Sequence, residues 1–314
     1  MKKITIITMA LAILLSACAP AAQGETVTLR IAVLPIIDTL PMFVAQQEGL
    51  FAKHGINVEF VPVASAPERD QILAASQADG TINETLAVML FNQESIQIQA
   101  VRYALRPTAN NGHFFIIASG KSGITDVNGL KGVEIGVSQG TVIEYVTERI
   151  LQAEGFSADE IQTIAVPRIP DRMALLGSGE LQAGVLPDPL GALAVGQGGV
   201  IVADDSKYPE YGFSIISFRK TVIDANPDAV RAFLAAIEEA TELVNADPAK
   251  YKNVLSEQNL VPPPLLETYQ APPFPSAGVP TLDEWNDALN WLKEKGILTV
   301  DVSYADSVNG SLLP

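Results

Sequence analysis

The stretch Leu40-Pro-Met-Phe-Val-Ala-Gln-Gln-Glu-Gly-Leu-Phe-Ala-Lys-His-Gly-Ile-Asn-Val-Glu59 decides the fold class of this chain. Within it, residues 41–53 place apolar side chains at helical spacing, and the pattern stops at Gly55, a residue type that suits the end of a helix. Residues 56–61 then read as a β-strand, as do residues 27–34 before the helix. The sequence therefore predicts a strand, helix, strand unit, and such units in series are typical of α/β proteins.

The same alternation continues along the chain. A long helix opens at Asn226-Pro227-Asp228, where Asn226 is the expected cap and Pro227 the first helical residue. Seven prolines then interrupt residues 261–280, and Thr281 caps a last helix with an apolar stripe of Leu282, Trp285, Leu289 and Leu292. We expect parallel sheets covered by helices on both faces. Further strands are predicted at 80–82, 96–105, 113–118, 133–137, 161–166, 181–186, 199–203 and 213–218, and helices at 67–78, 84–93, 141–154 and 171–178.

The first residues read as an export signal and not as part of the fold. Residues 1–17 have a basic start and an apolar stretch, and Leu15-Ser16-Ala17-Cys18 resembles the bacterial lipobox. Cys18 is the only cysteine, so it forms no intramolecular disulfide, and its lipidation would anchor the protein to a membrane. The small and polar residues 18–26 suit a tether. The alternative is an ordinary signal peptide with an accidental cysteine.

Length and charge argue against several classes of protein. The 314 residues carry a formal net charge of -16, which disfavours nucleic acid and anionic lipid as partners. No apolar run beyond the signal reaches the roughly 18 residues needed to span a bilayer. His54 and His113 are too isolated in the sequence to suggest a metal pair. We expect one large domain or two lobes, with neither metal nor cofactor.

Four segments together resemble a known family, the periplasmic receptors for nitrate, for taurine and other sulfonates, and for thiamine-precursor pyrimidines. The first is the opening stretch, residues 40–59. The others are Asp126-Val-Asn-Gly-Leu-Lys-Gly-Val-Glu-Ile-Gly136, Gly177-Ser-Gly-Glu-Leu-Gln-Ala-Gly184 and Asn226-Pro-Asp-Ala-Val-Arg-Ala-Phe-Leu234. Each segment is weak by itself, but their order and spacing cover nearly the whole mature chain.

The resemblance implies a two-lobed α/β periplasmic-binding-protein fold of type II, with the ligand between the lobes. Lobe one would be residues 27–110 plus 213–314, and lobe two residues 113–210. It also implies a monomeric, extracytoplasmic receptor that captures a small molecule and docks on the permease of an ABC importer. A sensory receptor is an alternative. A pyrimidine-synthesising enzyme of the same fold is another, but the cysteine-rich motif of such enzymes is absent, so we expect no catalysis.

Candidate ligand-binding residues follow predicted strands, because open α/β sheets bind ligands at the carboxyl ends of their strands. Residues 138–141 lie between a strand and a helix, where free amides and the positive helix end favour binding. Helix capping or a simple turn is the alternative for most of the other candidates, and solvent exposure for those one turn inside the helix. The full set is Asp38, Thr39, Asn83, Glu84, Ser138, Gln139, Gly140, Thr141, Glu144, Tyr145 and Asp188.

The acidic members of this set indicate the chemistry of the ligand. Asp38, Glu84, Glu144 and Asp188 would repel a sulfonate or nitrate, since like charges at about 4 Å cost on the order of 4 kcal/mol at an effective dielectric near 20. A ligand with N–H donors suits carboxylates. The sequence therefore favours an uncharged or cationic nitrogen-containing metabolite, such as a thiamine-precursor pyrimidine or a flavin. A receptor for sulfonate, taurine or nitrate is the alternative.

Overall fold

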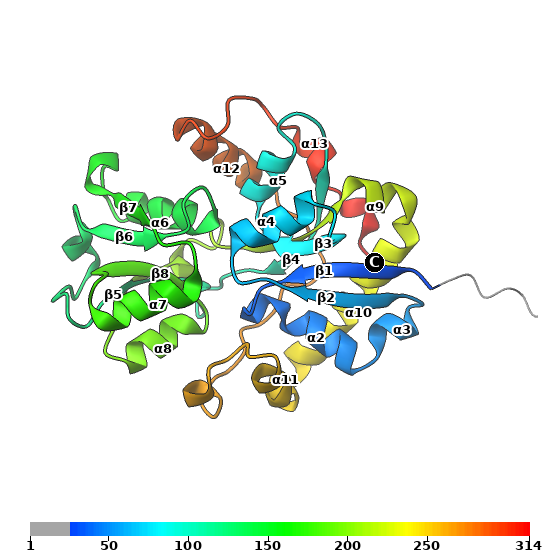
Figure 1. Ribbon diagram of the computed structural model, residues 1–314, viewed down its shortest axis with the longest axis horizontal. Helices are drawn as coiled ribbons and strands as arrows, with labels where there is room; N and C mark the ends of the chain where they lie inside the picture. Colours follow the sequence, from blue (N-terminus) through cyan, green and yellow to red (C-terminus); the bar gives the residue numbers. More distant parts are fainter. Residues whose placement is uncertain (1–25) are drawn as a thin grey trace, which may run out of the picture.

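The computed structural model describes residues 26–314, which form two lobes, each built on one five-stranded sheet (Figure 1). The predicted signal, the lipidation site Cys18 and the tether up to residue 25 lie outside the described residues. Lobe one holds the blue, cyan, yellow and red parts of the chain, and lobe two the green part. The strands of each sheet fall within the predicted ranges of the two lobes, whose exact limits stay a prediction.

The sheet of lobe one has the strand order β2-β1-β3-β10-β4. Strands β1, β2 and β3 are parallel, whereas β10 is antiparallel to β3 and to β4. The parallel units at the start of the chain confirm the strand, helix, strand pattern. The bounds are β1 Thr28–Val33, β2 Asn57–Pro62, β3 Gly80–Asn83, β4 Ile98–Leu105 and β10 Ser214–Arg219.

Helices cover both faces of this sheet because the strand side chains alternate. Leu29, Ile31 and Val33 of β1 pack with α2, α3 and α10, whereas Ala32 packs on the other face with α4, α5 and α12. The bounds are α2 Leu40–Gln47, α3 Leu50–Lys53, α4 Ala66–Ala74, α5 Thr85–Phe91, α9 Lys220–Ala225, α10 Pro227–Ala246, α11 Lys252–Glu257, α12 Leu282–Glu294 and α13 Tyr304–Ser307, with 3-10 turns at Ile37–Thr39, Pro248–Tyr251, Pro263–Leu265 (η6) and Gly310–Leu312.

Lobe two repeats this plan with the strand order β7-β6-β8-β5-β9. Helix α6 covers one face and helices α7 and α8 the other. The bounds are β5 Phe114–Ala118, β6 Glu134–Val137, β7 Gln162–Ala165, β8 Ala183–Pro187, β9 Val200–Asp204, α6 Val142–Ala153, α7 Ile169–Ser178 and α8 Leu190–Gly196, with 3-10 turns at Val127–Leu130, Ala158–Glu160 and Asp205–Lys207.

The expectation of parallel sheets was wrong, because both sheets are mixed. Strand β5 is antiparallel to β8 and β9, just as β10 is antiparallel to its neighbours in lobe one. Each of these two strands enters its sheet directly from the other lobe. A parallel strand needs a crossover helix, but a strand that arrives from outside can run either way. Local periodicity carries no signal for that direction.

Four local predictions also need correction. The helix predicted at 41–53 is two helices, since Gly49 between them is left-handed, with φ 69°. Asn226 precedes α10, but its side chain makes no capping hydrogen bond. Leu282 is 51% exposed and leaves the predicted stripe of α12, although Thr281 caps that helix as predicted. The small residues of α8, rich in Ala and Gly, gave no helical pattern, so that helix was missed.

Two segments, residues 106–113 and 205–213, connect the lobes, and side-chain contacts on two sides also join them. On one side, Tyr145 of α6 donates a hydrogen bond to Asp287 of α12 at 2.6 Å, and Arg149 pairs with the same carboxylate at 2.9 Å. On the other side, Tyr269 of the proline-rich segment donates a hydrogen bond to Asp188 of lobe two. The lobes therefore touch on both flanks of the space between them.

Candidate functional site

A cavity of about 560 Å³, open solvent at its mouth included, lies where the carboxyl ends of strands from both lobes meet. Leu34, Ile36 and Ile82 of lobe one form much of its apolar wall, together with Val142 and Ile143 of lobe two. A few polar groups converge on this wall from both sides. Such a mostly apolar space with a few fixed polar groups is typical of small-molecule sites.

Buried ion pairing occupies the carboxylate of Glu84 on the lobe-one side. Arg69 of α4 donates to both of its oxygens, at 2.9 and 3.1 Å, and to Asp70 at 2.8 Å. Burial works to lower the pKa of Arg69, but the carboxylates of Glu84 and Asp70 outweigh it and raise that pKa. Burial raises the pKa of the Glu84 carboxyl, against the opposing effect of Arg69. Because Arg69 occupies both oxygens of Glu84, that residue has little capacity left for a ligand.

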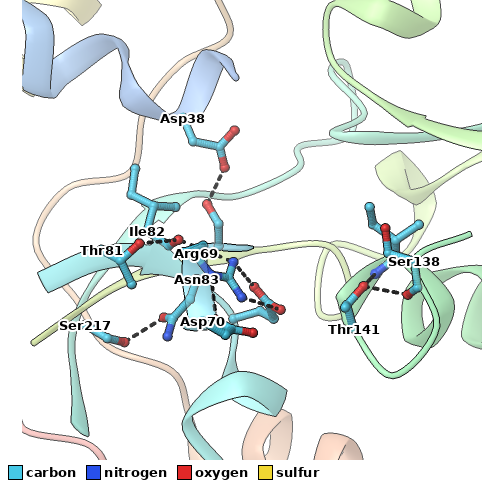
Figure 2. Close-up of polar contacts among 12 residues, drawn as sticks. Asp38, Arg69, Asp70, Thr81, Ile82, Asn83, Ser138, Thr141 and Ser217 are labelled. Carbon is cyan, nitrogen blue, oxygen red and sulfur yellow. Dashed lines mark hydrogen bonds and ion pairs between the residues drawn. The ribbon is translucent and has the colours of Figure 1, made fainter. Parts of the chain in front are cut away.

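Asn83 lies beside this pair with an unpartnered donor. Its Oδ1 accepts a hydrogen bond from Ser217 at 2.7 Å, which leaves the amide nitrogen Nδ2 to point elsewhere. That nitrogen is buried and has no partner among the described residues, although Asn83 lines the cavity. Figure 2 shows Arg69 and Asn83 on one side, and Ser138 and Thr141 on the other. Buried donors without partners are rare in proteins, so this one is available to any acceptor that reaches it.

The connecting segments meet at a second buried ion pair. Asp38 lies 3.1 Å from Nε2 of His113 and also accepts a hydrogen bond from Ser214. Nδ1 of His113 lies 2.6 Å from the carbonyl oxygen of Gly212. Both ring nitrogens face acceptors, so both must carry a proton. Burial works to lower the pKa of His113, but Asp38 outweighs it and raises the pKa to about 9.

Asp205 completes this junction from the lobe-two side. Its Oδ1 accepts from the amides of His113 and Phe114, at 2.7 and 3.1 Å. Burial raises the pKa of Asp205 to about 7, and its Oδ2 has no partner among the described residues. Hydrogen bonds thus join groups of both connecting segments and both lobes next to the cavity.

The lobe-two side carries Ser138 and Thr141 at the start of α6. Ser138 donates its hydroxyl to the Pro167 carbonyl at 2.9 Å, while Thr141 caps the helix by accepting from the Ile143 amide at 3.2 Å. The Gly140 amide donates to Glu144 at 2.8 Å. One of the amides expected to be free, that of Gly140, is thus already used within the protein.

The cavity wall includes five of the predicted site residues: Asp38, Asn83, Glu84, Ser138 and Thr141. The other six lie away from it. Thr39 donates to the Ile36 carbonyl, Gln139 is exposed, and Gly140 is paired with Glu144. Tyr145 and Asp188 make the contacts between lobes described above. Glu144 also accepts from Thr163 at 3.1 Å and lies 3.3 Å from Lys295. Ligand contact by any of the eleven stays a prediction.

All four carboxylates thought to face the ligand have partners inside the protein. Arg69 forms an ion pair with Glu84, and His113 forms one with Asp38. Asp188 accepts a hydrogen bond from Tyr269. Glu144 lies beside Lys295 and accepts a hydrogen bond from the Gly140 amide. The premise of a repulsive acidic mouth is therefore not met. Burial does raise the pKa of Asp188, to about 6, against the opposing hydrogen bond from Tyr269.

Arg69, His113 and Ser214 were the polar cavity residues that sequence reasoning missed. Arg69 did carry a signal, because it lies four residues before the buried Leu73 and so shares the inner face of α4. A charged residue on a buried helix face needs a partner. His113 was considered only as a metal ligand. Residues 26–314 contain no group of three or more His, Cys, Asp or Glu side chains that could hold a metal ion.

Comparison with solved structures identifies the class of fold. The alkanesulfonate-binding protein SsuA from Xanthomonas axonopodis pv. citri, bound to MOPS, matches with a TM-score of 0.76 and 18% identity, over 91% of this chain and 99% of that one. The desulfurization enzyme DSZB matches with a TM-score of 0.66 and 14% identity, over 91% and 97%. The two-lobed binding-protein fold is confirmed.

The family follows from sequence comparison. A model of the NMT1-like family matches residues 22–256, and this chain belongs to that family. A Bacillus subtilis (strain 168) protein named for binding aliphatic sulfonates is 28% identical over 250 residues, 76% of this chain and 73% of that protein. The nitrate/nitrite binding protein NrtA of Nostoc sp. is 22% identical over 243 residues, 71% and 55%. A Haemophilus influenzae protein named for thiamine biosynthesis is 24% identical over 218 residues, 67% and 66%. The predicted family resemblance is confirmed.

Proposed function

We propose that this protein is the solute-binding component of an ABC importer and that the cavity between its lobes holds the transported solute. The observation that carries this proposal is the cavity itself, which is lined from both lobes above two connecting segments. Rotation about such segments can enclose a solute and present a closed form to a permease. Relatives named as binding proteins for sulfonates and for nitrate support the same role.

The cavity best suits a small solute with an apolar body and hydrogen-bond acceptors. The apolar wall suits the body, and the free Nδ2 of Asn83 suits an acceptor. The sequence favoured a nitrogen-containing heterocycle for its N–H donors, a preference that rested on free carboxylates. A pyrimidine also carries acceptors, so a vitamin-related heterocycle stays a prediction beside a sulfonate, taurine or nitrate. The unpartnered Asn83 donor favours the acceptor-rich candidates.

Anchoring and location extend the proposal to the N-terminus. Lipidation of Cys18, in the lipobox-like Leu15-Ser16-Ala17-Cys18, would hold a monomeric receptor outside the cytoplasmic membrane next to its permease. The segment that follows it is short and its residues are small or polar, as a tether requires. No helix within residues 26–314 is both long and apolar enough to cross a membrane.

Binding fits the cavity better than catalysis does. The chain has a single cysteine, Cys18, which precedes the described residues, so a thiol nucleophile is missing from residues 26–314. Ser138 donates its hydroxyl to a carbonyl oxygen and has no general base beside it, while both ring nitrogens of His113 are engaged. DSZB nevertheless shows that an enzyme can share this fold.

Native mass spectrometry of the purified protein, followed by denaturation, tests the proposal. We expect a bound small molecule to be released, and calorimetric titration of that molecule into stripped protein to give saturable binding at one site. Asn83→Ala should weaken this binding by about tenfold, the value of one buried hydrogen bond. Asn290→Ala, at an exposed position on α12, is the matched control and should bind like wild type. Turnover of the released molecule would instead favour an enzyme.

A further inference from the structure

Acceptors of the protein itself take up most of the hydrogen-bond donors that the side chains of the cavity wall carry. The polar residues of that wall are Asp38, Arg69, Asn83, Glu84, His113, Ser138, Thr141 and Ser214. The three hydroxyl groups among them donate to the carbonyls of Pro167 and Ser138 and to Asp38. Within the described residues, the one side-chain nitrogen of the wall without a partner is Nδ2 of Asn83.

Both cations of the wall are joined to carboxyl groups. Nε of Arg69 donates to Asp70, while its Nη1 and Nη2 donate to the two oxygens of Glu84. One ring nitrogen of His113 lies 3.1 Å from Asp38, and the other faces a backbone carbonyl. Arg69 and His113 are both buried, so solvent screens these pairs little. A solute that enters the cavity therefore meets no cation that is free to pair with it.

Acceptors of the protein also occupy the positive end of helix α6. The Gly140 amide donates to Glu144, and Thr141 caps the helix with its hydroxyl. The backbone amide of Val142, the first residue of α6, interacts with the carboxyl of Glu84 from the opposite lobe. Helix N-termini attract anions through such amides, so internal acceptors at this helix end remove much of that attraction.

We propose that Glu84 determines the charge of the solute, because it engages both Arg69 and the start of α6, and that the cavity therefore prefers uncharged solutes to anions. An anion loses its hydration in an apolar cavity, and only several donors or a free cation can replace it. The wall offers Nδ2 of Asn83, which suits one carbonyl oxygen or ring nitrogen. Arg172 lies 3.5 Å from the Ser138 hydroxyl but is not among the residues that line the cavity. The inference rests on the proposed function, since it assigns a charge to the solute of the same cavity.

Pairs of probes that differ in charge but little in shape test this inference. Methyl phenyl sulfone with benzenesulfonate, and nicotinamide with nicotinate, each compare a neutral molecule with an anion built on the same ring. Calorimetry and thermal unfolding of solute-free wild type should show tighter binding of the neutral member than of its anion. Glu84→Gln keeps the size of the side chain but deprives Arg69 of a carboxyl partner, so the anions should bind at least about tenfold more tightly than to wild type.

Glu238→Gln is the matched control. Glu238 accepts from Nε and Nη2 of the buried Arg102, at 3.2 and 2.6 Å, and neither residue lines the cavity. This variant should bind the anions as wild type does. Asp38→Asn removes the carboxyl partner of His113 and is a second cavity variant, with the same expected gain of anion binding, which covers the case of a misfolded Glu84→Gln protein.

Three outcomes would overturn the inference: tighter binding of an anion than of its neutral partner by wild type, no gain of anion binding in the cavity variants, or an equal gain in Glu238→Gln. The molecule released from the purified protein should be uncharged at neutral pH, and an anion in its place would overturn the inference but leave the receptor function standing. Failure of wild type to retain or bind any small molecule would overturn the proposed function itself.

Discussion

The stability of this protein should fall with rising pH because of one buried pair, His113 and Asp38. Both residues are 2% exposed, and the ring of His113 donates to Asp38 and to the Gly212 carbonyl. The pKa of His113 is raised from 6.5 to about 9 in the folded protein. A raised pKa means that the folded state holds this proton more tightly than the unfolded state does. The extra stability is complete below pH 6.5 and is lost as the pH rises through about 9.

The magnitude follows from the size of the shift. At about 1.4 kcal/mol per pKa unit, the shift from 6.5 to about 9 contributes roughly 3 kcal/mol, and both groups are too buried for solvent to screen much of it. The slope between those values is about -1.4 kcal/mol per pH unit. Asp38 has a lowered pKa and stays ionised throughout, so it adds no slope of its own.

Urea unfolding of wild type and His113→Gln at a series of pH values measures this slope. Glutamine keeps an amide donor for Asp38 but does not titrate. Asp205 has a pKa of about 7, so the comparison belongs above that pH, where its carboxyl is ionised. The difference in unfolding free energy between the two proteins should shrink by about 3 kcal/mol up to about pH 10. Parallel curves for the two proteins would refute the reasoning.

Three further predictions concern the lobe contacts and the anchor. Tyr269→Phe leaves the Asp188 carboxyl without its hydrogen-bond donor and should lower the free energy of unfolding in urea by about 1 to 3 kcal/mol at pH 8. The loss should be smaller well below pH 6, where that carboxyl is protonated. Equal losses at both pH values would contradict this. Asp287→Ala removes the acceptor shared by Tyr145 and Arg149, and small-angle scattering should show a larger radius of gyration for the solute-free variant, with Asp301→Ala on the surface as control. Cys18→Ala should move the protein from the membrane fraction to the soluble one, and an unchanged membrane fraction would rule out the lipid anchor.

Sequence patterns predicted the order of strands and helices because that order depends on local periodicity. They also directed attention to Asn83, Glu84, Ser138 and Thr141, since each was expected just after a predicted strand and the carboxyl ends of strands meet at one edge of a sheet. The sequence patterns could not predict the direction of β5 and β10 in their sheets. It depends on how a strand arrives from the other lobe, and neither its composition nor its alternation records that.

The sequence also could not predict most of the ion-pair and hydrogen-bond partners of the charged residues. Asp38 is paired with His113 and Ser214, which lie far along the chain, so the free acidic mouth inferred from composition is neutralised by folding. The pairing of Glu84 with Arg69 spans only fifteen residues, and the buried face of α4 pointed to it. Arg172 is fully buried, and its Nε and Nη2 atoms have no partner among the described residues. The sequence alone could not show this, because an exposed arginine gives the same sequence signal.

The position of β10 between β3 and β4 has a consequence for how the chain is made. Strand β4 has no neighbour in its sheet except β10, which is synthesised only after the whole of lobe two. Lobe two is contiguous, so it can fold as soon as it emerges, whereas β3 and β4 wait with unpaired edges that invite aggregation. A chain that leaves the cell through a secretion channel from its N-terminus meets the same order of events. We therefore expect β3 and β4 to depend on a chaperone until β10, which ends at Arg219, is available to pair with them.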